Sequence, residues 1–395
     1  MTQKSALHSA TNRRDGYSID KLSAASVAFI KDQQKVNGAY PASPDFSAYT
    51  GYCWFRDGAY IADAMSAAGE IASAELFFDW CAEVLTTRRE QILHIVTETL
   101  DGRPPAGENM LPARFTFDGK DGDADWWDFQ LDGYGTWLWA LGEHNARHGR
   151  SLERWREAIT LTVDYLTCSW ERPCYDWWEE HAEYVHVSTL GCVGSGLTSI
   201  IGKELLDPSD ESHAIGVVEA IRHRIDTDGV QNGHLTKWLG TNAVDASLLA
   251  LVAPMDFIDP LASTGKTTIY VIDEQLTVNN GVHRYLDDTY YGGGQWPLLS
   301  CFMGLAQAAA GNRSRAEELL FWAASTVRGE QELPEQVEDH LLDPQHLQPW
   351  IDRWGHSASP LLWSHAMFIR LAVTLGHSTT HNNGVSLPQT IERDN

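Results

Sequence analysis

Residues 294–311 (GQWPLLSCFMGLAQAAAG) and residues 313–328 (RSRAEELLFWAASTVR) are two helix-forming segments separated by Asn312. Apolar residues recur in both segments at helical spacing. Glycine followed by asparagine is typical of a tight break between two helices. The stretch therefore predicts a helical hairpin, and the same pattern recurs along most of the chain.

Long loops alternate with these predicted hairpins. Further helices are predicted at residues 18–34, 56–69, 71–96, 129–148, 152–168, 187–206, 211–227, 243–252 and 359–375. Loops rich in Gly, Pro and Trp lie at residues 37–54, 101–127, 171–184, 285–296 and 330–355. The alternation predicts an all-α toroid of hairpins whose long loops gather at one end, where a functional site is normally built. Strand signals are weak, and the best candidate for a short buried strand is 267–272.

The length of 395 residues allows one to three domains. A hydrophobic content of 43% with 16 tryptophans indicates a large core. The chain has no linker-like segment and no break in composition, so we predict a single domain over residues 1–395. The polar segment 377–395 is predicted to be a mobile tail.

The chain is acidic, with 54 acidic against 29 basic residues and a formal net charge of −25. Nucleic acids and anionic membranes need basic patches, so neither is an expected partner. No apolar stretch approaches the roughly 20 residues that span a bilayer, and residues 1–15 do not resemble a secretory signal. The six cysteines lack metal-binding spacing and are predicted to be reduced thiols. These features predict a cytoplasmic protein with a neutral or cationic ligand.

Residues 176–180 (DWWEE) place two adjacent carboxylates after two indoles. A carboxyl group against an apolar indole is harder to ionise, so its pKa rises. A carboxylic acid kept protonated near neutral pH can donate a proton to a leaving group. A half-buried helix start with surface acids is the better explanation of any one such pair. A second isolated carboxylate, Glu335, together with clusters of Arg, Asp and Trp that suit a sugar, favours a catalytic site.

Two of these clusters have the chemistry of sugar binding. Arg56 and Asp57 place donors beside an acceptor, which suits two vicinal hydroxyls. Taken alone, the pair is better explained as a helix start that Asp57 caps. Trp126 and Trp127 can form a stacking wall for a sugar face or belong to the core.

Other patterns argue against a metal or a cofactor. The aspartates of residues 118–125 lack the spacing and the bidentate Glu of an EF-hand, so a solvated loop is expected there. The triple glycine 292–294 has no phosphate-loop context, and a loop that approaches a ligand closely is expected instead. The chain also lacks an HExxH zinc site and a GxSxG serine elbow.

Six motifs in order resemble glycoside hydrolase family 15, the glucoamylase and glucodextranase family. They are residues 54–57 (WFRD), 126–132 (WWDFQLD), 176–180 (DWWEE), 284–296 (RYLDDTYYGGGQW), 335–336 (EQ) and 362–366 (LWSHA). The resemblance implies an (α/α)6 barrel of six inner and six outer helices. It also implies that Glu179 is the general acid and Glu335 the general base. The residues that it implies for binding the terminal glucose are Arg56, Asp57, Trp126, Trp178, Glu180, Arg284, Tyr290 and Trp363.

The chain departs from the family pattern at two positions. Fungal members carry a Tyr four residues before the first motif's Trp, where this chain has Thr50, with Tyr49 one residue away. Trp177 stands where an aliphatic residue is common and is expected to narrow the pocket. We expect the chain to lack the extra N-terminal β-domain of the bacterial members and a starch-binding domain.

The resemblance implies an exo-acting, inverting α-glucosidase that releases β-glucose from the non-reducing end of short α-glucosides. The compact form is most similar to the isomaltose-cleaving members, so isomaltose is the expected substrate. Inversion places the two carboxyl groups ~6.5–9.5 Å apart, and no cofactor is required. Residues 345–356 are expected to close the pocket beyond two sugars.

The alternatives are a trehalase or an α-1,4-glucosidase on the same barrel, and a non-catalytic sugar-binding barrel. Binding alone does not need a water-activating base, so the presence of both Glu179 and Glu335 argues against the last. A helical-repeat scaffold for protein partners would not crowd Trp and Gly into alternate loops. Linkage, chain length and oligomeric state stay open.

Overall fold

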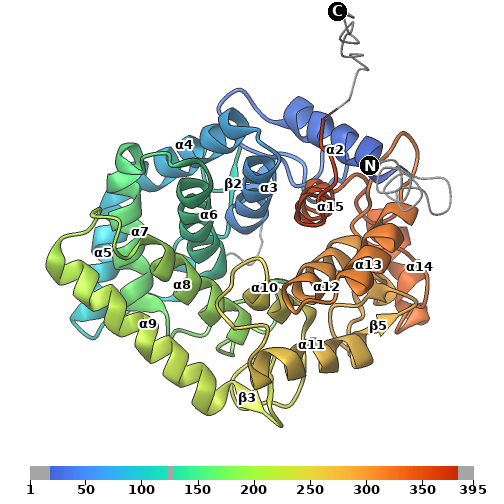
Figure 1. Cartoon of the computed structure of the whole chain (residues 1–395). Coiled ribbons are helices and arrows are strands. Elements are labelled where there is room, and N and C mark those ends of the chain that lie inside the picture. Colours follow the sequence, from blue (N-terminus) through green and yellow to red (C-terminus); the bar gives the residue numbers. More distant parts are fainter. Residues whose placement is uncertain (1–17, 123–128, 381–395) are drawn as a thin grey trace, which may run out of the picture.

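The computed structural model describes residues 18–122 and 129–380, which form two concentric rings of helices (Figure 1). The inner ring consists of α3 (Phe55–Ala67), α6 (Asp132–His148), α8 (Val187–Ile200), α10 (Leu249–Val252), α12 (Pro297–Ala309) and α15 (Leu362–Thr374). Each inner helix contacts the next one, and α15 closes the ring against α3. A closed ring of this kind leaves both ends of the inner helices facing loops.

An outer helix covers each inner one. In the order of the inner helices α15, α3, α6, α8, α10 and α12, the covering helices are α2 (Ile19–Gln33), α4 (Ile71–Thr87), α7 (Arg156–Ser169), α9 (Pro208–Asp228), α11 (Ser263–Leu276) and α13 (Arg313–Ser325). An additional helix, α5 (Arg89–Leu100), packs on α7. The predicted all-α fold, an (α/α)6 barrel, is confirmed.

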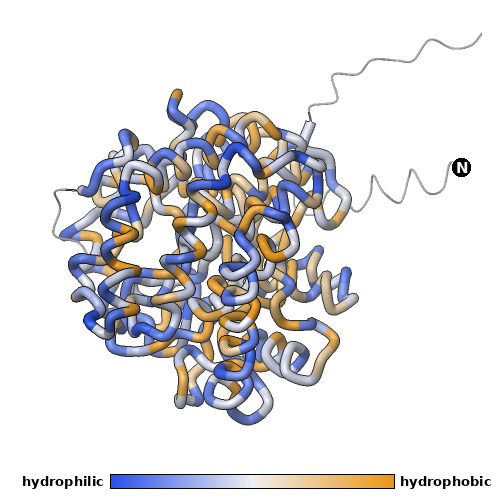
Figure 2. Tube along the Cα trace, turned by 90° about the vertical axis from the view of Figure 1, so that its left-hand side faces the viewer, coloured by the Kyte–Doolittle hydropathy of each residue, from blue (hydrophilic) through white to orange (hydrophobic). Residues whose placement is uncertain are grey.

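The two rings differ in how they bury their residues. The inner helix α12 is buried over most of its length, and its sequence is apolar on nearly all sides. Outer helices alternate hydrophobic and hydrophilic residues along the chain, as the hydropathy colouring of Figure 2 shows. One cluster of buried hydrophobic residues extends from Ile19 to Leu375, so both rings share a continuous core.

The helical hairpin predicted over residues 294–328 is confirmed, with α12 and α13 separated by a three-residue break. Gly311 there has a φ of +87°, a left-handed conformation that glycine adopts without steric cost. The N–H of the following Asn312 donates to the carbonyl of Gln307 at 2.8 Å, which satisfies a terminal carbonyl of α12.

Two predicted elements were wrong. Residues 267–272 are not a strand but the middle of α11, with Thr268, Ile269, Ile272 and Leu276 buried along one helical face. The β-branched residues favour a strand locally, and packing against the inner ring overrides that preference. The single helix predicted at 71–96 is divided at Arg88 into α4 and α5.

Short strands and turns build the loops between the helices. The strands form three antiparallel pairs: β1 (Tyr52–Trp54) with β2 (Arg114–Thr116), β3 (Val230–Gln231) with β4 (His234–Leu235), and β5 (Thr277–Val278) with β6 (Gly281–Val282). The 3-10 turns are η1 (Gly107–Asn109), η2 (Glu153–Trp155), η3 (Ala246–Leu248), η4 (Tyr290–Gly292) and η5 (Pro344–His346). One further helix, α14 (Leu347–Trp354), lies within a segment that was predicted to be loop.

The start of the predicted tail is bound to the barrel. His377 and the backbone N–H of Ser378 contact one carboxylate oxygen of Asp20 on α2, at 3.2 and 3.1 Å. The remainder of the tail, residues 381–395, lies outside the described residues. Among the helices of residues 18–122 and 129–380, none has the length and apolar composition needed to cross a membrane.

Helices α6 and α8 approach so closely that their glycines cannot carry a side chain. A Cβ on Gly196 would lie 2.3 Å from the carbonyl oxygen of Gly135. We expect Gly196→Ala to lower the free energy of unfolding by about 1–3 kcal/mol, the usual cost of overpacking. Denaturant unfolding measures it.

Gly216→Ala is the matched control, because a Cβ on Gly216 of the outer helix α9 meets no atom within 4 Å. This substitution should raise stability by about 0.5–1 kcal/mol through helix propensity. Equal effects of the two substitutions would contradict the close approach of α6 and α8.

Candidate active site

A cavity of about 640 Å³ opens at one end of the inner ring. Nine of the ten predicted site residues line it: Arg56, Asp57, Trp178, Glu179, Glu180, Arg284, Tyr290, Glu335 and Trp363. The tenth, Trp126, lies outside the described residues. Residues separated by hundreds of positions in sequence thus share one cavity.

Glu335 is buried in the cavity wall, with 2% of its surface exposed. The hydroxyl of Tyr49 donates to its Oε1 at 2.7 Å, and the hydroxyl of Tyr290 lies 2.8 Å from that of Tyr49 and 3.5 Å from Oε2. Burial raises the pKa of Glu335 to about 7, against the opposing effects of the Tyr49 hydrogen bond and of the Arg284 charge. A carboxyl group of this pKa exchanges protons near neutral pH.

The first turn of α15 holds the segment that carries Glu335. The hydroxyl of Ser364 donates to the carbonyl of Pro334 at 2.7 Å, and Nε2 of His365 accepts from the N–H of Leu333 at 3.0 Å. Burial lowers the pKa of His365 to about 3, so its ring is neutral and able to accept. The backbone before Glu335 is therefore fixed from the barrel side.

Glu179 sits in a turn that its own neighbours close. Oδ1 of Asp176 accepts the N–H groups of Trp178 and Glu180, each at 2.9 Å. Glu179 itself has a φ of +63°, a left-handed conformation that costs a non-glycine residue about 1–3 kcal/mol. A residue stays in such a strained conformation only where the contacts around it hold it there, which is typical of functional sites.

The carboxylate of Glu179 is oriented by a tryptophan from another element. Nε1 of Trp54, at the end of β1, donates to Oε1 of Glu179 at 2.6 Å. The hydrogen bond therefore does not come from the indoles of the 176–180 stretch. Trp178 instead donates its Nε1 to both carboxylate oxygens of Asp245, at 3.1 and 2.9 Å.

Two buried arginines that line the cavity are each held by acids. Arg56 contacts Asp132 at 3.2 Å and Asp57 at 3.3 Å. Burial raises the pKa of Asp57 to about 6, although Arg56 opposes the shift. Arg284 forms an ion pair with Asp288 and contacts Glu180 at 3.4 Å. Each arginine thus keeps a fixed orientation and places a carboxylate beside donor groups, which suits binding of vicinal hydroxyls.

The hydroxyl of Tyr285 completes the second of these groups. It donates to Oε2 of Glu180, whose Oε1 faces Arg284. Both carboxylate oxygens of Glu180 therefore have a partner in the wall.

Aromatic rings form the rest of the wall. Trp178 packs against Trp296 with 5.6 Å between ring centroids, and Trp350 of α14 packs on Tyr290 at 4.2 Å. Trp363, in the first turn of α15, stacks on Tyr60 with 5.6 Å between ring centroids. These rings give the cavity flat apolar faces of the kind that sugars stack on.

Trp177 is one of the residues that line the cavity. It is 1% exposed, and its ring packs against Tyr60, Phe302 and Trp363 with 5.6 to 5.9 Å between centroids. Its narrowing of the pocket relative to an aliphatic residue stays a prediction.

Sequence reasoning missed several lining residues. Tyr49, which bonds to Glu335, was noted only as one position away from the expected tyrosine. The tryptophans and the arginine of α14, Trp350, Arg353 and Trp354, belong to the segment expected to close the pocket, and they line the cavity. The signal in α14 was its aromatic content, since no regular spacing marked these residues.

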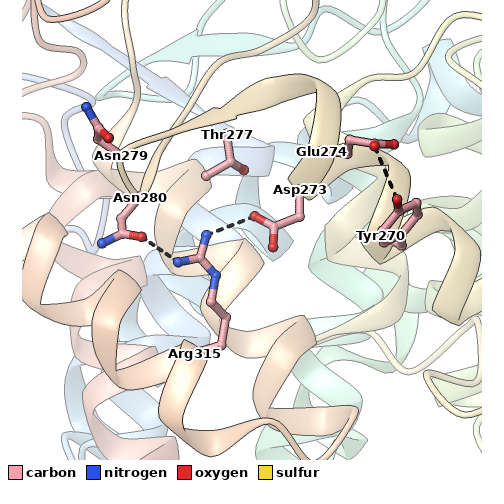
Figure 3. A pocket seen from close by; sticks show the side chains of 7 residues that line it. All are labelled: Tyr270, Asp273, Glu274, Thr277, Asn279, Asn280 and Arg315. Carbon is pink, nitrogen blue, oxygen red and sulfur yellow. Dashed lines mark hydrogen bonds and ion pairs between the residues drawn. The ribbon is translucent and has the colours of Figure 1, made fainter.

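A second hollow, of about 330 Å³, lies outside the barrel between α11, the β5–β6 turn and α13. Arg315 points between Asp273 and Asn280 in Figure 3, and Tyr270 donates to Glu274 at 3.1 Å. These polar groups satisfy one another, so the hollow is a junction between elements. Within residues 18–122 and 129–380, no group of three metal-ligating side chains gathers. Part of the aspartate-rich loop 118–125 lies outside these residues.

A family model described as Glycosyl hydrolases family 15 matches residues 25–328. A protein of Kribbella flavida named isomaltose glucohydrolase is 48% identical over 359 residues, which cover 91% of this chain and 93% of that protein. An uncharacterized glycosyl hydrolase of Methanocaldococcus jannaschii is 23% identical, covering 89% of this chain and 55% of that protein.

Solved structures agree with these relatives. The structure of a glycosidase superposes with a TM-score of 0.88 at 47% identity, covering 91% of this chain and 97% of that one. A variant of a glycosidase, with the same similarity, was solved in complex with glucose. A bacterial glucoamylase complexed with acarbose has a TM-score of 0.67 at 20% identity, covering 91% of this chain and 56% of that one, and shows the fold alone.

We expect Glu335→Gln to raise the free energy of unfolding at pH 8. The pKa of folded Glu335 is about 7, whereas its ordinary value is 4.5. At a pH between these two pKa values, the folded state binds more protons than the unfolded state. The free energy of unfolding therefore falls as the pH rises through this range. The shift corresponds to about 3 kcal/mol at pH 8, and the neutral glutamine avoids this loss.

Denaturant unfolding at pH 4 and pH 8 measures the effect. Glu330→Gln is the control, since it removes the same charge from an exposed position in the same loop. The free energy of unfolding should rise above that of the wild type at pH 8 only, and only for Glu335→Gln. If Glu335→Gln is no more stable than the wild type at pH 8, this result would contradict the conclusion that burial destabilises the ionised form of Glu335.

Proposed function

The chain belongs to glycosyl hydrolases family 15, and from this premise we propose that it is an exo-acting, inverting α-glucosidase with isomaltose as its preferred substrate. The observation that carries the proposal is the pairing of Glu179 and Glu335 in one cavity with the two arginine–carboxylate groups. The 48% identity to a protein named isomaltose glucohydrolase supports the choice of substrate.

In the proposed reaction, Glu179 donates a proton to the glycosidic oxygen. The bond between that oxygen and C1 of the terminal glucose breaks, and the rest of the sugar leaves as an alcohol. A water molecule attacks C1 from the opposite face of the ring. Glu335 takes a proton from this water, so the product is β-glucose. Both steps are proton transfers to or from carboxyl groups, and neither calls for a cofactor.

Tyr49 and the burial of Glu335 set the proton affinity of the base. The Tyr49 hydroxyl favours the ionised carboxylate by donating to it, while burial favours the protonated form. A base whose pKa is raised to about 7 is ionised in half of the molecules at neutral pH and is a stronger proton acceptor than an exposed Glu. Activity should therefore fall as pH is lowered through this value.

The terminal glucose is bound by the two arginine–carboxylate groups and the aromatic wall. We infer that Arg56 with Asp57 binds one edge of the ring and Arg284 with Glu180 the other. Trp178 and Trp363 then shape the faces of this position. Trp126 is proposed for the same pocket from the family resemblance alone.

Helix α14 supports a preference for short substrates. Trp350, Arg353 and Trp354 of this helix line the cavity, and Arg353 is exposed to solvent. We infer that α14 borders the cavity mouth, so that each further sugar of a longer chain has to pass it. Trehalose and α-1,4 linkages remain the alternative substrates on this fold, and a sugar-binding role without catalysis is not favoured, because both carboxyl groups are present.

We also infer the setting in which the enzyme works. Its expected partners are a short oligosaccharide and the glucose product. All six cysteines are unpaired, which is typical of a reducing compartment such as the cytoplasm. The continuous core from Ile19 to Leu375 supports a single catalytic domain over residues 1–395.

The substrate proposal is tested by comparing kcat/KM for isomaltose, isomaltotriose, maltose and trehalose. A shape difference between linkages is worth about 1–3 kcal/mol, or about 10- to 200-fold in kcat/KM. We expect isomaltose to be best by such a margin, with a fall for isomaltotriose. Faster cleavage of maltose or trehalose would contradict the linkage, and a rise with chain length would contradict the role of α14.

The catalytic proposal is tested by Glu179→Gln and Glu335→Gln. Each should lower turnover of isomaltose by about 10²- to 10⁴-fold, the usual contribution of a positioned proton-transfer group. Glu183→Gln, an exposed change in the loop of Glu179, is the matched control and should leave turnover within a few-fold of wild type. Near-wild-type turnover in either of the first two variants would remove that residue from the mechanism.

A further inference from the structure

A buried lysine lies behind the turn that carries Glu179. Lys237 is only 4% exposed and is not among the residues that line the cavity. Its backbone N–H donates to the carbonyl of Ala243 at 2.8 Å, and its own carbonyl accepts from Val187, the first residue of α8, at 3.2 Å. Lysine is almost never buried to this extent without a charged partner.

Three partners surround the ammonium group of Lys237. Its Nζ lies 3.2 Å from Oδ2 of Asp245 and 3.6 Å from Oδ2 of Asp176, and both carboxylates are 2% exposed. The same Nζ lies 3.1 Å from the ring centroid of Tyr285. One cation therefore faces two buried carboxylates and an aromatic ring.

Each partner of Lys237 holds a different part of the 176–180 turn with its other atoms. Asp176 uses Oδ1 to accept the two backbone N–H groups that close the turn. Asp245 accepts the indole N–H of Trp178, and Tyr285 donates its hydroxyl to Glu180. The contacts of Lys237 thus converge on the residues on both sides of Glu179.

The charge of Lys237 decides whether this arrangement is stable. Two buried carboxylates without a cation repel each other, and burial favours protonation of one of them. A protonated Asp176 would make weaker hydrogen bonds to the turn, since bonds to an ionised acceptor are roughly twice as strong as neutral ones. These weaker hydrogen bonds would hold Glu179 less firmly in its left-handed conformation.

We propose that Lys237 is a positioning residue for the general acid, acting through Asp176 and Asp245 on the turn that carries Glu179. It touches neither the cavity nor the substrate. This inference rests on the proposed function, because it assumes that Glu179 donates a proton to the leaving group.

The test compares two substrates that differ in their need for an acid. Cleavage of isomaltose requires protonation of the leaving oxygen, whereas α-glucosyl fluoride releases fluoride, which leaves without a proton. Lys237→Met removes the charge and keeps an unbranched apolar side chain of similar length. We expect kcat for isomaltose to fall by about 10²-fold, within the usual contribution of an acid, with KM changed little and hydrolysis of the fluoride within a few-fold of wild type.

Equal losses on the two substrates, or no loss on isomaltose, would overturn the proposal. Glu179→Gln supplies the reference for loss of the acid and should show the same difference between substrates. Failure of the wild-type enzyme to cleave isomaltose would count against the proposed function itself, so the two failures are distinguishable.

Two further variants separate positioning from stability. Arg370→Met removes a cation that lies 2.8 Å from the buried Asp63, and both residues are outside the cavity lining. This variant should lower stability, but it should not make the loss of rate on isomaltose differ from the loss on the fluoride. If Lys237→Met does not fold, Asp176→Asn tests the same route, because the amide keeps an oxygen for the turn but loses the charge. A difference between the substrates in Asp176→Asn supports the proposal, and its absence overturns it.

Discussion

Charge that is buried in the protein interior is the constraint on which this site depends. A carboxylate removed from water is unstable unless a cation or several donors face it. Here three buried cations each face two acids: Arg56 contacts Asp57 and Asp132, Lys237 contacts Asp176 and Asp245, and Arg284 contacts Glu180 and Asp288. The groups that bind and react are therefore held rigidly before a substrate arrives, which favours catalysis by preorganised groups.

The ring of helices brings these charges together at one end. Arg56 and Asp57 lie in the first turn of α3, and Asp132 and Trp363 in the first turns of α6 and α15. The amino ends of these three inner helices thus lie at the end of the ring where the cavity opens. A helix carries a partial positive charge at its amino end, which stabilises nearby carboxylates by about 0.3–1 kcal/mol each. The helix ends therefore supply part of the positive charge that stabilises the buried acids.

The sequence predicted the architecture well because helical periodicity and Gly–Asn breaks are local signals. The resemblance located the site residues, and nine of them share the cavity. Residues 267–272 were misassigned, since β-branched side chains favour strands until tertiary packing is known. The local sequence around Tyr49 and Lys237 does not predict their roles. These roles depend on contacts with residues that lie mostly tens or hundreds of positions away in the chain. The left-handed backbone of Glu179 is likewise set by Asp176 and not by its own residue type.

We propose a single displacement by water, with Glu179 and Glu335 on opposite faces of the sugar. The decisive measurement is proton NMR of the first glucose released from isomaltose, recorded before mutarotation equilibrates the anomers. We predict that β-glucose appears first and that α-glucose grows in later. Early α-glucose would contradict it, since retention requires a covalent intermediate and a closer pair of carboxyl groups.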